Sequence, residues 1–245
     1  MVERAFADPR LARLYDPLCS PGRTDLAFYL PFVTAAPSVL DVGCGTGELL
    51  RTAREAGHRG RLCGLDPAAA MLDVARRRDD VEWVLGDLTT TRPAGPFELV
   101  VMTGHAFQVL LTDDAVRHAL AAMRSLLAPG GRLVFETRNP AAREWTRWTR
   151  DAVRTFVADG RRHRYWSEVE AVDGDLVTFT QTYAGPGPDD VATSRSTLRF
   201  LDAERLAAFL DDAGLATLAR FGDWDRSPFG PDSPEIVTVA CGRPA

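Results

Sequence analysis

Short apolar runs and longer amphipathic stretches alternate along the first 140 residues of the chain. Apolar runs rich in β-branched side chains predict buried strands, whereas apolar residues that recur every three or four positions predict helices. Strands are predicted over 38–42, 61–65, 81–85, 97–102 and 132–137. The helices between them are predicted over 48–56, 68–77 and 112–127. This alternation indicates an α/β fold with a parallel, doubly wound sheet that binds ligands at the carboxyl ends of its strands.

The pattern changes after residue 140. The segment that carries Trp145 and Trp148 predicts a helical connector. Three runs then alternate polar and apolar positions between turn residues, over 165–172, 176–183 and 191–200, which is typical of antiparallel strands. A last helix and two last strands are predicted over 202–213, 217–221 and 235–240. The sequence therefore predicts a small antiparallel β insertion after the fifth strand and a closing pair of strands at the end of the chain.

The first 37 residues alternate charged and apolar positions. Leu11, Leu14 and Tyr15 predict one short helix, and the apolar run over 26–33 predicts a second. Because prolines and a glycine lie between these helices, the segment over 15–23 is predicted to be irregular or mobile. We therefore expect three parts: a helical cap over 1–37, a ligand-binding sheet domain over 38–140 and 201–245, and an insertion over 141–200.

A glycine-rich turn follows the first predicted strand. Gly43, Gly45 and Gly47 stand at alternate positions, and Asp41 comes just before them. Glycine lets the backbone adopt positive φ and approach a ligand closely, and the N–H groups at a helix start offer hydrogen-bond donors. The spacing differs from the G-x-G-x-x-G turn that holds a pyrophosphate. A carboxylate at Asp41 would repel a pyrophosphate but would suit a ligand that carries an ammonium group.

The segment from Val39 to Leu50 resembles the first motif of class I S-adenosylmethionine-dependent methyltransferases, with Asp41 at the acidic position of that motif. The resemblance implies a Rossmann-like, seven-stranded sheet with an antiparallel last strand, and S-adenosylmethionine as the cofactor. It extends over nearly the whole chain. Its motifs are specific over 39–108, weak before residue 38 and only architectural after residue 140.

Two further carboxylates follow the second and third predicted strands. Asp66 can accept hydrogen bonds from ribose hydroxyls, as in enzymes that use NAD, or it can cap the helix that begins after Pro67. Asp87 lies in Gly86-Asp87-Leu88, which resembles the family segment whose carboxylate receives the adenine amino group while the next N–H meets a ring nitrogen. A turn-forming role is the alternative for Asp87. Three carboxylates at three successive strand ends form a more specific signal than any one of them.

The motifs and the resemblance together give one set of candidate residues for the cofactor site. The set comprises Asp41, Gly43, Cys44, Gly45, Gly47, Asp66, Pro67, Met71, Asp87, Leu88, Thr103, Gly104 and Arg23. Met71 could pack on the adenine face, although a helical Met is more often part of a core. The resemblance places Thr103 and Gly104 beside the methionyl part of the cofactor. Arg23 could form a charge-assisted pair with the cofactor carboxylate, or it could face solvent.

Two residues are candidates for the catalytic step. His105 follows the fourth predicted strand, and its imidazole could remove a proton from the acceptor because histidine titrates near neutral pH. The alternative is that His105 only hydrogen-bonds the loop or the substrate. Tyr15 resembles the N-terminal tyrosine whose phenol caps the active site of small-molecule methyltransferases, although a packing role is also open. The other histidines, His58, His118 and His163, are expected at the surface.

Composition narrows the class of protein. A formal net charge of −5 and a pI of about 5.4 argue against a large nucleic-acid footprint. The loop at His105 also lacks the Asn/Asp-Pro-Pro-aromatic signature of methyltransferases that act on nucleic-acid bases. No apolar run approaches the ~18–20 residues of a membrane helix, and the first residues are not a secretory signal, so we expect a cytoplasmic protein, either a monomer or a homodimer. The four cysteines form no C-x-x-C pair, which favours reduced thiols and no metal site.

The leading hypothesis is a methyltransferase that moves a methyl group from S-adenosylmethionine to an oxygen or nitrogen of a small molecule, such as a specialised metabolite, by in-line displacement. An aromatic acceptor lid is predicted in the insertion, from Trp145, Trp148, Tyr165 and Trp166 with Arg138 nearby. Two alternatives stay open. One is an NAD(P)-dependent oxidoreductase, which the glycine spacing disfavours, and the other is a protein that binds the cofactor but methylates nothing.

Overall fold

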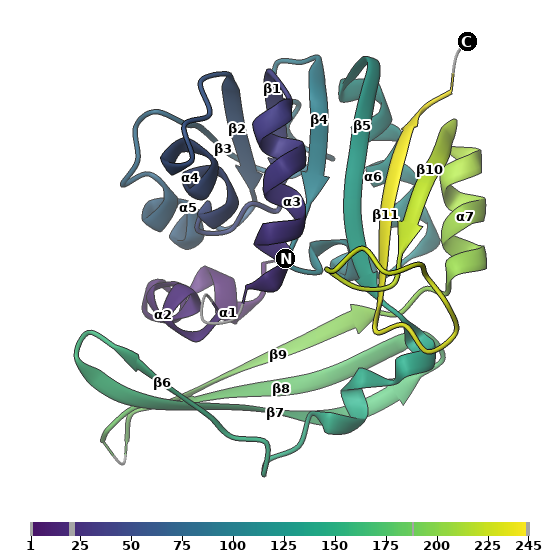
Figure 1. Cartoon of the computed structure of the whole chain (residues 1–245). Coiled ribbons are helices and arrows are strands. Elements are labelled where there is room, and N and C mark those ends of the chain that lie inside the picture. Colours follow the sequence, from purple (N-terminus) through teal and green to yellow (C-terminus); the bar gives the residue numbers. More distant parts are fainter. Residues whose placement is uncertain (1, 20–22, 188, 244–245) are drawn as a thin grey trace.

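The computed structural model describes residues 2–19, 23–187 and 189–243 and contains two β-sheets, one above the other (Figure 1). The larger sheet has seven strands in the order β10-β11-β5-β4-β1-β2-β3. Five of them run parallel: β1 (Ser38–Val42), β2 (Arg61–Asp66), β3 (Glu82–Leu85), β4 (Phe97–Met102) and β5 (Leu127–Arg138). The last strand, β11 (Glu235–Gly242), is antiparallel to β5 and to β10 (Leu215–Phe221). The predicted doubly wound sheet with an antiparallel last strand is confirmed.

Helices cover both faces of this sheet. On one face, α6 (Asp113–Leu126) and α7 (Ala203–Asp212) pack on a core that includes Leu40 and Phe135. On the other face, α3 (Thr24–Ala35) and α4 (Glu48–Glu55) pack on a core that includes Val39 and Val101. Neighbouring strand residues such as Val39 and Leu40 thus enter opposite cores, which is why the parallel strands are continuous apolar runs. None of the described helices is long and apolar enough to cross a membrane.

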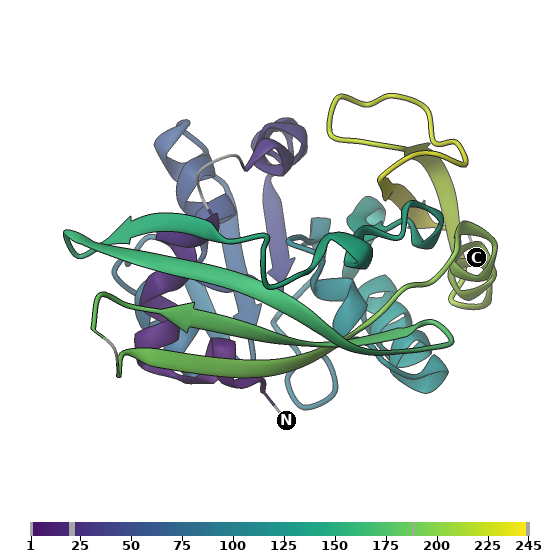
Figure 2. The same ribbon diagram turned by 90° about the horizontal axis from the view of Figure 1, so that it is seen from below.

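The second sheet is built from the inserted segment and lies below the first (Figures 1 and 2). Its four antiparallel strands are β6 (Arg154–Ala158), β7 (Arg161–Asp173), β8 (Leu176–Ala184) and β9 (Val191–Arg199), in that order. The predicted antiparallel insertion is confirmed, but the sequence does not predict β6. This strand is only five residues long, and it begins with two exposed polar residues that obscure the alternation.

The connector between the sheets contains two short 3₁₀ turns, η2 (Pro140–Ala142) and η3 (Glu144–Arg147), in place of a longer helix. Its tryptophans anchor the second sheet. Trp145 lies edge-on against Phe200, at 4.5 Å between ring centroids, and Trp148 lies 4.7 Å from Phe179. Both rings therefore pack against other aromatic side chains of the insertion.

The N-terminal helices lie between the two sheets (Figure 1). α1 (Arg4–Ala7) is short, and α2 extends over Pro9–Cys19. The prediction of an irregular segment over 15–23 is therefore wrong for residues 15–19, while residues 20–22 lie outside the described part of the chain. Helix α2 continues through Pro17 because Leu11 and Leu18 pack against Phe156 and Tyr183 of the second sheet. This packing outweighs the single backbone hydrogen bond that a proline removes.

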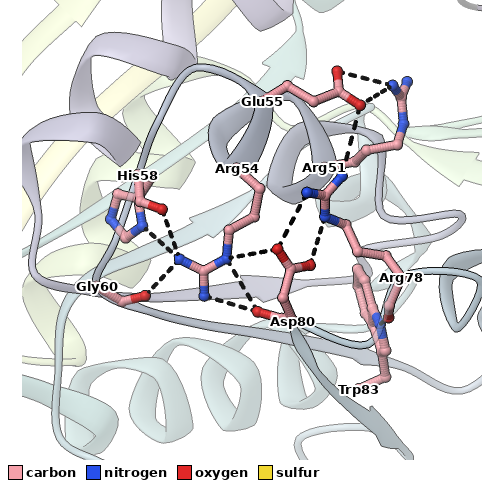
Figure 3. Close-up of polar contacts among 8 residues, drawn as sticks. All are labelled: Arg51, Arg54, Glu55, His58, Gly60, Arg78, Asp80 and Trp83. Carbon is pink, nitrogen blue, oxygen red and sulfur yellow. Dashed lines mark hydrogen bonds and ion pairs between the residues drawn. The ribbon is translucent and has the colours of Figure 1, made fainter.

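One arginine joins the end of α4 to the segments that lead into β2 and β3 (Figure 3). The Arg54 guanidinium donates to the carbonyl oxygens of His58, Gly60 and Asp80 at 2.8 to 3.0 Å. His58 is buried, and its Nε2 lies 2.8 Å from the carbonyl oxygen of Ala36. The prediction of a surface position for His58 is wrong, because the turn after α4 folds inward around Arg54.

The replacement Arg54→Ala is expected to lower the free energy of unfolding by about 2–4 kcal/mol, since three carbonyl oxygens lose a charged donor. Arg51→Ala is the matched control on the same helix. Arg51 pairs with Glu55, and its side chain is 46% exposed against 13% for Arg54, so its loss should cost less than about 1 kcal/mol. Equilibrium urea unfolding measures both variants, and equal losses would contradict this account.

The four cysteines carry free thiols, as predicted. Cys44 in the glycine loop and Cys63 in β2 are both buried. Burial raises the pKa of Cys63 to about 12, so this thiol is protonated at neutral pH and is a poor nucleophile. Cys63 therefore acts as a small apolar residue of the sheet core, and Cys44 packs in a separate cluster with Leu72 and Ala75.

Candidate functional site

The carboxyl end of β1 leads into a loop whose glycine positions have no room for a side chain. Gly43, Gly45 and Gly47 have positive φ values of +71°, +56° and +77°. A Cβ atom at Gly45 would lie 3.2 Å from Met71 Cε, and one at Gly47 would lie 2.3 Å from the Trp83 ring. Both the conformation and the space therefore require glycine at this loop.

Asp41 lies just before the loop, with 1% of its surface exposed. Its Oδ1 atom has no hydrogen-bond partner among the residues that the structure describes. Burial raises the pKa of Asp41 to about 8, while the charge of Arg23 opposes the shift and those of Asp66 and Glu136 add to it. A buried carboxylate is stable in the ionised form only when a cation or several donors face it. Asp41 therefore fits a ligand that brings an ammonium group.

A small cavity of about 30 Å³ adjoins Asp41. Its wall contains eight of the predicted site residues: Tyr15, Arg23, Asp41, Gly43, Cys44, Gly45, Thr103 and Gly104. The Tyr15 hydroxyl lies 3.8 Å from where a Cβ atom of Gly104 would be. Arg23 donates to the Asp25 carboxylate at 2.6 to 2.9 Å and to Glu48 at 3.1 Å. The structure thus brings the N-terminal helices and the ends of β1 and β4 together at one point.

Asp66 ends β2 and is buried. Its two carboxylate oxygens accept hydrogen bonds from the N–H groups of Gly45 and Ala68, both at 2.8 Å. Burial raises the pKa of Asp66, and these two backbone hydrogen bonds oppose the shift. Because an ionised carboxylate has about four acceptor sites, each oxygen can still accept a hydroxyl donor. Pro67 is exposed in the turn that follows, and Met71 is buried between Gly45 and the N-terminal helices.

Asp87 and Leu88 follow β3, the edge strand of the sheet. The Asp87 side chain is exposed, and its Oδ1 accepts hydrogen bonds from the N–H and hydroxyl groups of Thr89 and Thr90 at 2.6 to 3.0 Å. The Thr89 hydroxyl and the other donors lower the pKa of Asp87, so it is ionised at neutral pH. Leu88 packs partly against the core beneath α6. The turn-forming role of Asp87 is present, and its adenine role stays a prediction.

His105 follows Gly104 but does not line the small cavity. Its backbone N–H donates to Glu136 Oε1 at 2.6 Å, and its ring Nε2 lies 3.0 Å from Glu235 Oε2. Burial and, to a smaller extent, the charge of Arg138 lower the pKa of His105 to about 4. Burial also raises the pKa of Glu235 to about 8. The structure therefore gives His105 a buried acidic partner, which both of its predicted roles allow.

Three acidic residues near these groups are not predicted from the sequence: Glu48, Glu136 and Glu235. Glu48 follows the glycine turn directly, and Glu136 interrupts the apolar strand β5, so both carry a local signal because charged residues are rarely buried without a partner. No local signal marks Glu235. It reaches His105 only because β11 pairs antiparallel with β5, which places Glu235 opposite Arg138.

Known proteins resemble this chain in sequence. Residues 39–131 match the family model of the methyltransferase domain. The chain is 32% identical over 171 residues to the 2-phytyl-1,4-naphtoquinone methyltransferase of Thermosynechococcus vestitus, an alignment that covers 63% of this chain and 73% of that protein. It is 33% identical over 189 residues to the dTDP-4-amino-2,3,4,6-tetradeoxy-D-glucose N,N-dimethyltransferase of Saccharopolyspora spinosa, covering 74% of this chain and 72% of that protein.

Solved structures resemble it in fold. An S-adenosylmethionine-dependent methyltransferase from Clostridium acetobutylicum aligns with a TM-score of 0.74 over 96% of this chain and 98% of that chain, at 14% identity. That likeness shows the shared fold, and the identity and coverage of the two sequence relatives show the family. The chain therefore belongs to the class I S-adenosylmethionine-dependent methyltransferases, enzymes in which S-adenosylmethionine is the methyl donor.

Proposed function

We propose that the chain transfers the methyl group of S-adenosylmethionine to an oxygen or nitrogen atom of a small molecule, by in-line displacement at the methyl carbon. The observation that carries the proposal is the buried Asp41 carboxylate at the glycine loop, whose Oδ1 has no hydrogen-bond partner in the described part of the chain. The two sequence relatives are named for a naphtoquinone and for an amino sugar, which supports a small-molecule acceptor.

Three carboxylates along the sheet edge would hold the cofactor. Asp41 would accept from its ammonium group, Asp66 from its ribose hydroxyls and Asp87 from its adenine amino group. Arg23, held in place by Asp25 and Glu48, would face its carboxylate. When bound, the cofactor supplies a methyl group on a positively charged sulfur, which is a good leaving group.

The N-terminal helices would keep water away from the reacting atoms. The Tyr15 hydroxyl stands over Gly104, and the Thr46 hydroxyl donates to Asp16 of α2 at 2.5 Å, which ties α2 to the glycine loop. The cavity of about 30 Å³ at Asp41 is lined by neither Asp66 nor Asp87, so it would hold only the amino-acid end of the cofactor. Helix α2 packs against Ala68 and Met71 beside Asp66, and we propose that it moves away for the cofactor to enter and returns to close the site.

The proposal is tested in two steps with the full chain. Calorimetric titration with S-adenosylhomocysteine measures whether the cofactor site binds. Mass spectrometry then follows the protein with S-adenosylmethionine and a panel of phenols, alcohols and amines, and the expected result is a product heavier by one methylene group. Binding without any methylated product would indicate a cofactor-binding protein without transfer activity, and no binding would overturn the proposal.

A further inference from the structure

Two buried glutamates contact His105: Glu136 contacts its backbone and Glu235 contacts its ring. His105 has a φ of +60°, a left-handed conformation that is unfavourable for a non-glycine residue. Glu136 holds the residue in this conformation by accepting a hydrogen bond from its N–H at 2.6 Å. The Tyr29 hydroxyl donates to the other oxygen of Glu136, which is fully buried. Strained backbone that its surroundings fix in this way is typical of functional sites.

The second carboxylate, Glu235, fixes the ring. Its two oxygens lie 3.1 and 3.0 Å from Nε2 of His105, and the two side chains are 10% and 18% exposed respectively. The edge of Trp224 packs beside the imidazole, at 6.3 Å between ring centroids. No residue in the described part of the chain hydrogen-bonds Nδ1 of His105. The ring is therefore anchored at one nitrogen and open at the other.

We infer that Glu235 is the positioning residue of His105: its carboxylate accepts a hydrogen bond from Nε2–H and so presents Nδ1 as the nitrogen that takes the proton of the methyl acceptor. The hydrogen bond that one ring nitrogen makes sets the proton position on the other. The inference rests on the proposed function, and it names a residue from the far end of the chain that the sequence does not indicate.

A bond forms between the acceptor oxygen or nitrogen and the methyl carbon, and the carbon–sulfur bond breaks with its electron pair left on sulfur. The acceptor proton passes to Nδ1 of His105. The resulting imidazolium is stabilised by the ionised Glu235 carboxylate at Nε2.

The pair should titrate as one unit. Burial raises the pKa of Glu235 to about 8, and Arg138 on β5 opposes that shift, while Glu144, Asp223 and Asp25 add to it. Glu136 also faces the imidazole. Below about pH 8 Glu235 is protonated and donates to Nε2, so the neutral imidazole carries its own proton on Nδ1 and cannot accept another there. Turnover should therefore increase as the pH rises through about 8, where Glu235 ionises.

The test compares Glu235→Gln with a control, Glu98→Gln. Glu98 is exposed and lies near the start of β4, at the end of that strand away from His105. For the best acceptor of the panel, Glu235→Gln should lower kcat by about 100-fold or more, because a positioned general base contributes about 10²–10⁴. The KM for S-adenosylmethionine should change by less than about twofold, and the rise near pH 8 should disappear. Glu235→Asp, which withdraws the carboxylate by one methylene, should retain the pH step with intermediate activity. Glu98→Gln should match the wild type.

A second readout does not need an acceptor. The imidazole nitrogen resonances of His105, assigned by their loss in His105→Gln, should titrate between about pH 7 and 9 in the wild type and not in Glu235→Gln. Wild-type kcat and an unchanged pH profile in Glu235→Gln would overturn the inference while leaving the proposed function intact. If no acceptor is methylated, the proposed function fails, and identical titrations of His105 in the two proteins would overturn the inference independently.

Discussion

The replacement Asp41→Asn is expected to weaken the binding of S-adenosylhomocysteine by about 30-fold or more, because truncating one partner of a buried charge pair costs about 2–5 kcal/mol. The side chain keeps its shape, so the loss reports the charge. In the free protein Oδ1 of Asp41 has no partner in the described chain, and the ammonium group of the ligand would be its first. Asp73→Asn, at an exposed position on α5 (Ala69–Ala75), is the matched control and should bind like the wild type.

Ligand binding at Asp41 is also expected to release a proton. Burial raises the pKa of free Asp41 to about 8, so it is largely protonated at neutral pH, whereas a bound ammonium favours the carboxylate. Binding near neutral pH should therefore release a proton, and affinity should increase as the pH rises through about 8. Calorimetry in buffers of different ionisation enthalpy measures the release. Asp41→Asn should release none, and a wild type without proton release would contradict the buried ammonium contact.

The raised pKa of Asp41 also determines how this residue changes the stability of the folded protein with pH. Its folded pKa lies above the unfolded value, so the native state binds the proton more tightly, and its contribution to stability is lost as the pH rises from about 4 to about 8. The free Asp41→Asn protein should consequently melt at a higher temperature than the wild type in alkaline buffer, although it binds the ligand poorly. This opposition is expected for a group that serves binding at the expense of stability.

The replacement Gly47→Ala is expected to lower the free energy of unfolding by about 2–4 kcal/mol, combining left-handed strain with overpacking. Its Cβ atom would lie 2.3 Å from the Trp83 ring. That ring cannot withdraw easily, because it also lies 2.6 Å from where a Cβ atom of Gly64 would be, and its Nε1 donates to the carbonyl oxygen of Arg78 at 2.9 Å. Displacement of the glycine loop should also abolish detectable S-adenosylhomocysteine binding in calorimetry.

The control variant Gly130→Ala separates the effect of left-handed backbone strain from the effect of crowding around the added Cβ atom. Gly130 has the same φ of +77°, but apart from its two chain neighbours no described residue has an atom within 4 Å of its would-be Cβ. It should lose only about 1 kcal/mol of stability and retain full binding. Adding Trp83→Leu to Gly47→Ala should restore part of the stability. Equal behaviour of Gly47→Ala and Gly130→Ala in urea unfolding would show that the Trp83 contact is unimportant.

Much of the fold follows from local patterns. The parallel strands are continuous apolar runs, and the glycines at 43, 45 and 47 combine positive φ with crowding that only glycine allows. Asp41 and Asp66 were predicted by their places at strand ends, and both lie at the glycine loop. These features depend on a few neighbouring residues, which is why the sequence indicates them.

Features that depend on packing between segments far apart in the chain cannot be predicted from local sequence patterns. Helix α2 passes through Pro17 because its apolar side meets a sheet built about 140 residues later. His58 is buried because the Arg54 guanidinium donates hydrogen bonds to three carbonyl oxygens, one of them that of His58, and so folds the turn inward. Glu235 contacts His105 across 130 positions of the chain, through strand pairing that no local pattern encodes.

The central claim is that S-adenosylmethionine lies along the carboxyl edge of the larger sheet with its ammonium group on Asp41. A crystal structure of the protein with S-adenosylhomocysteine tests it most directly. We predict the amino nitrogen within about 3 Å of Asp41 Oδ1, the ribose at Asp66 and the adenine at Asp87. Ligand density elsewhere, or a glycine loop that binds the pyrophosphate of NAD while Asp41 stays without a partner, would contradict the account.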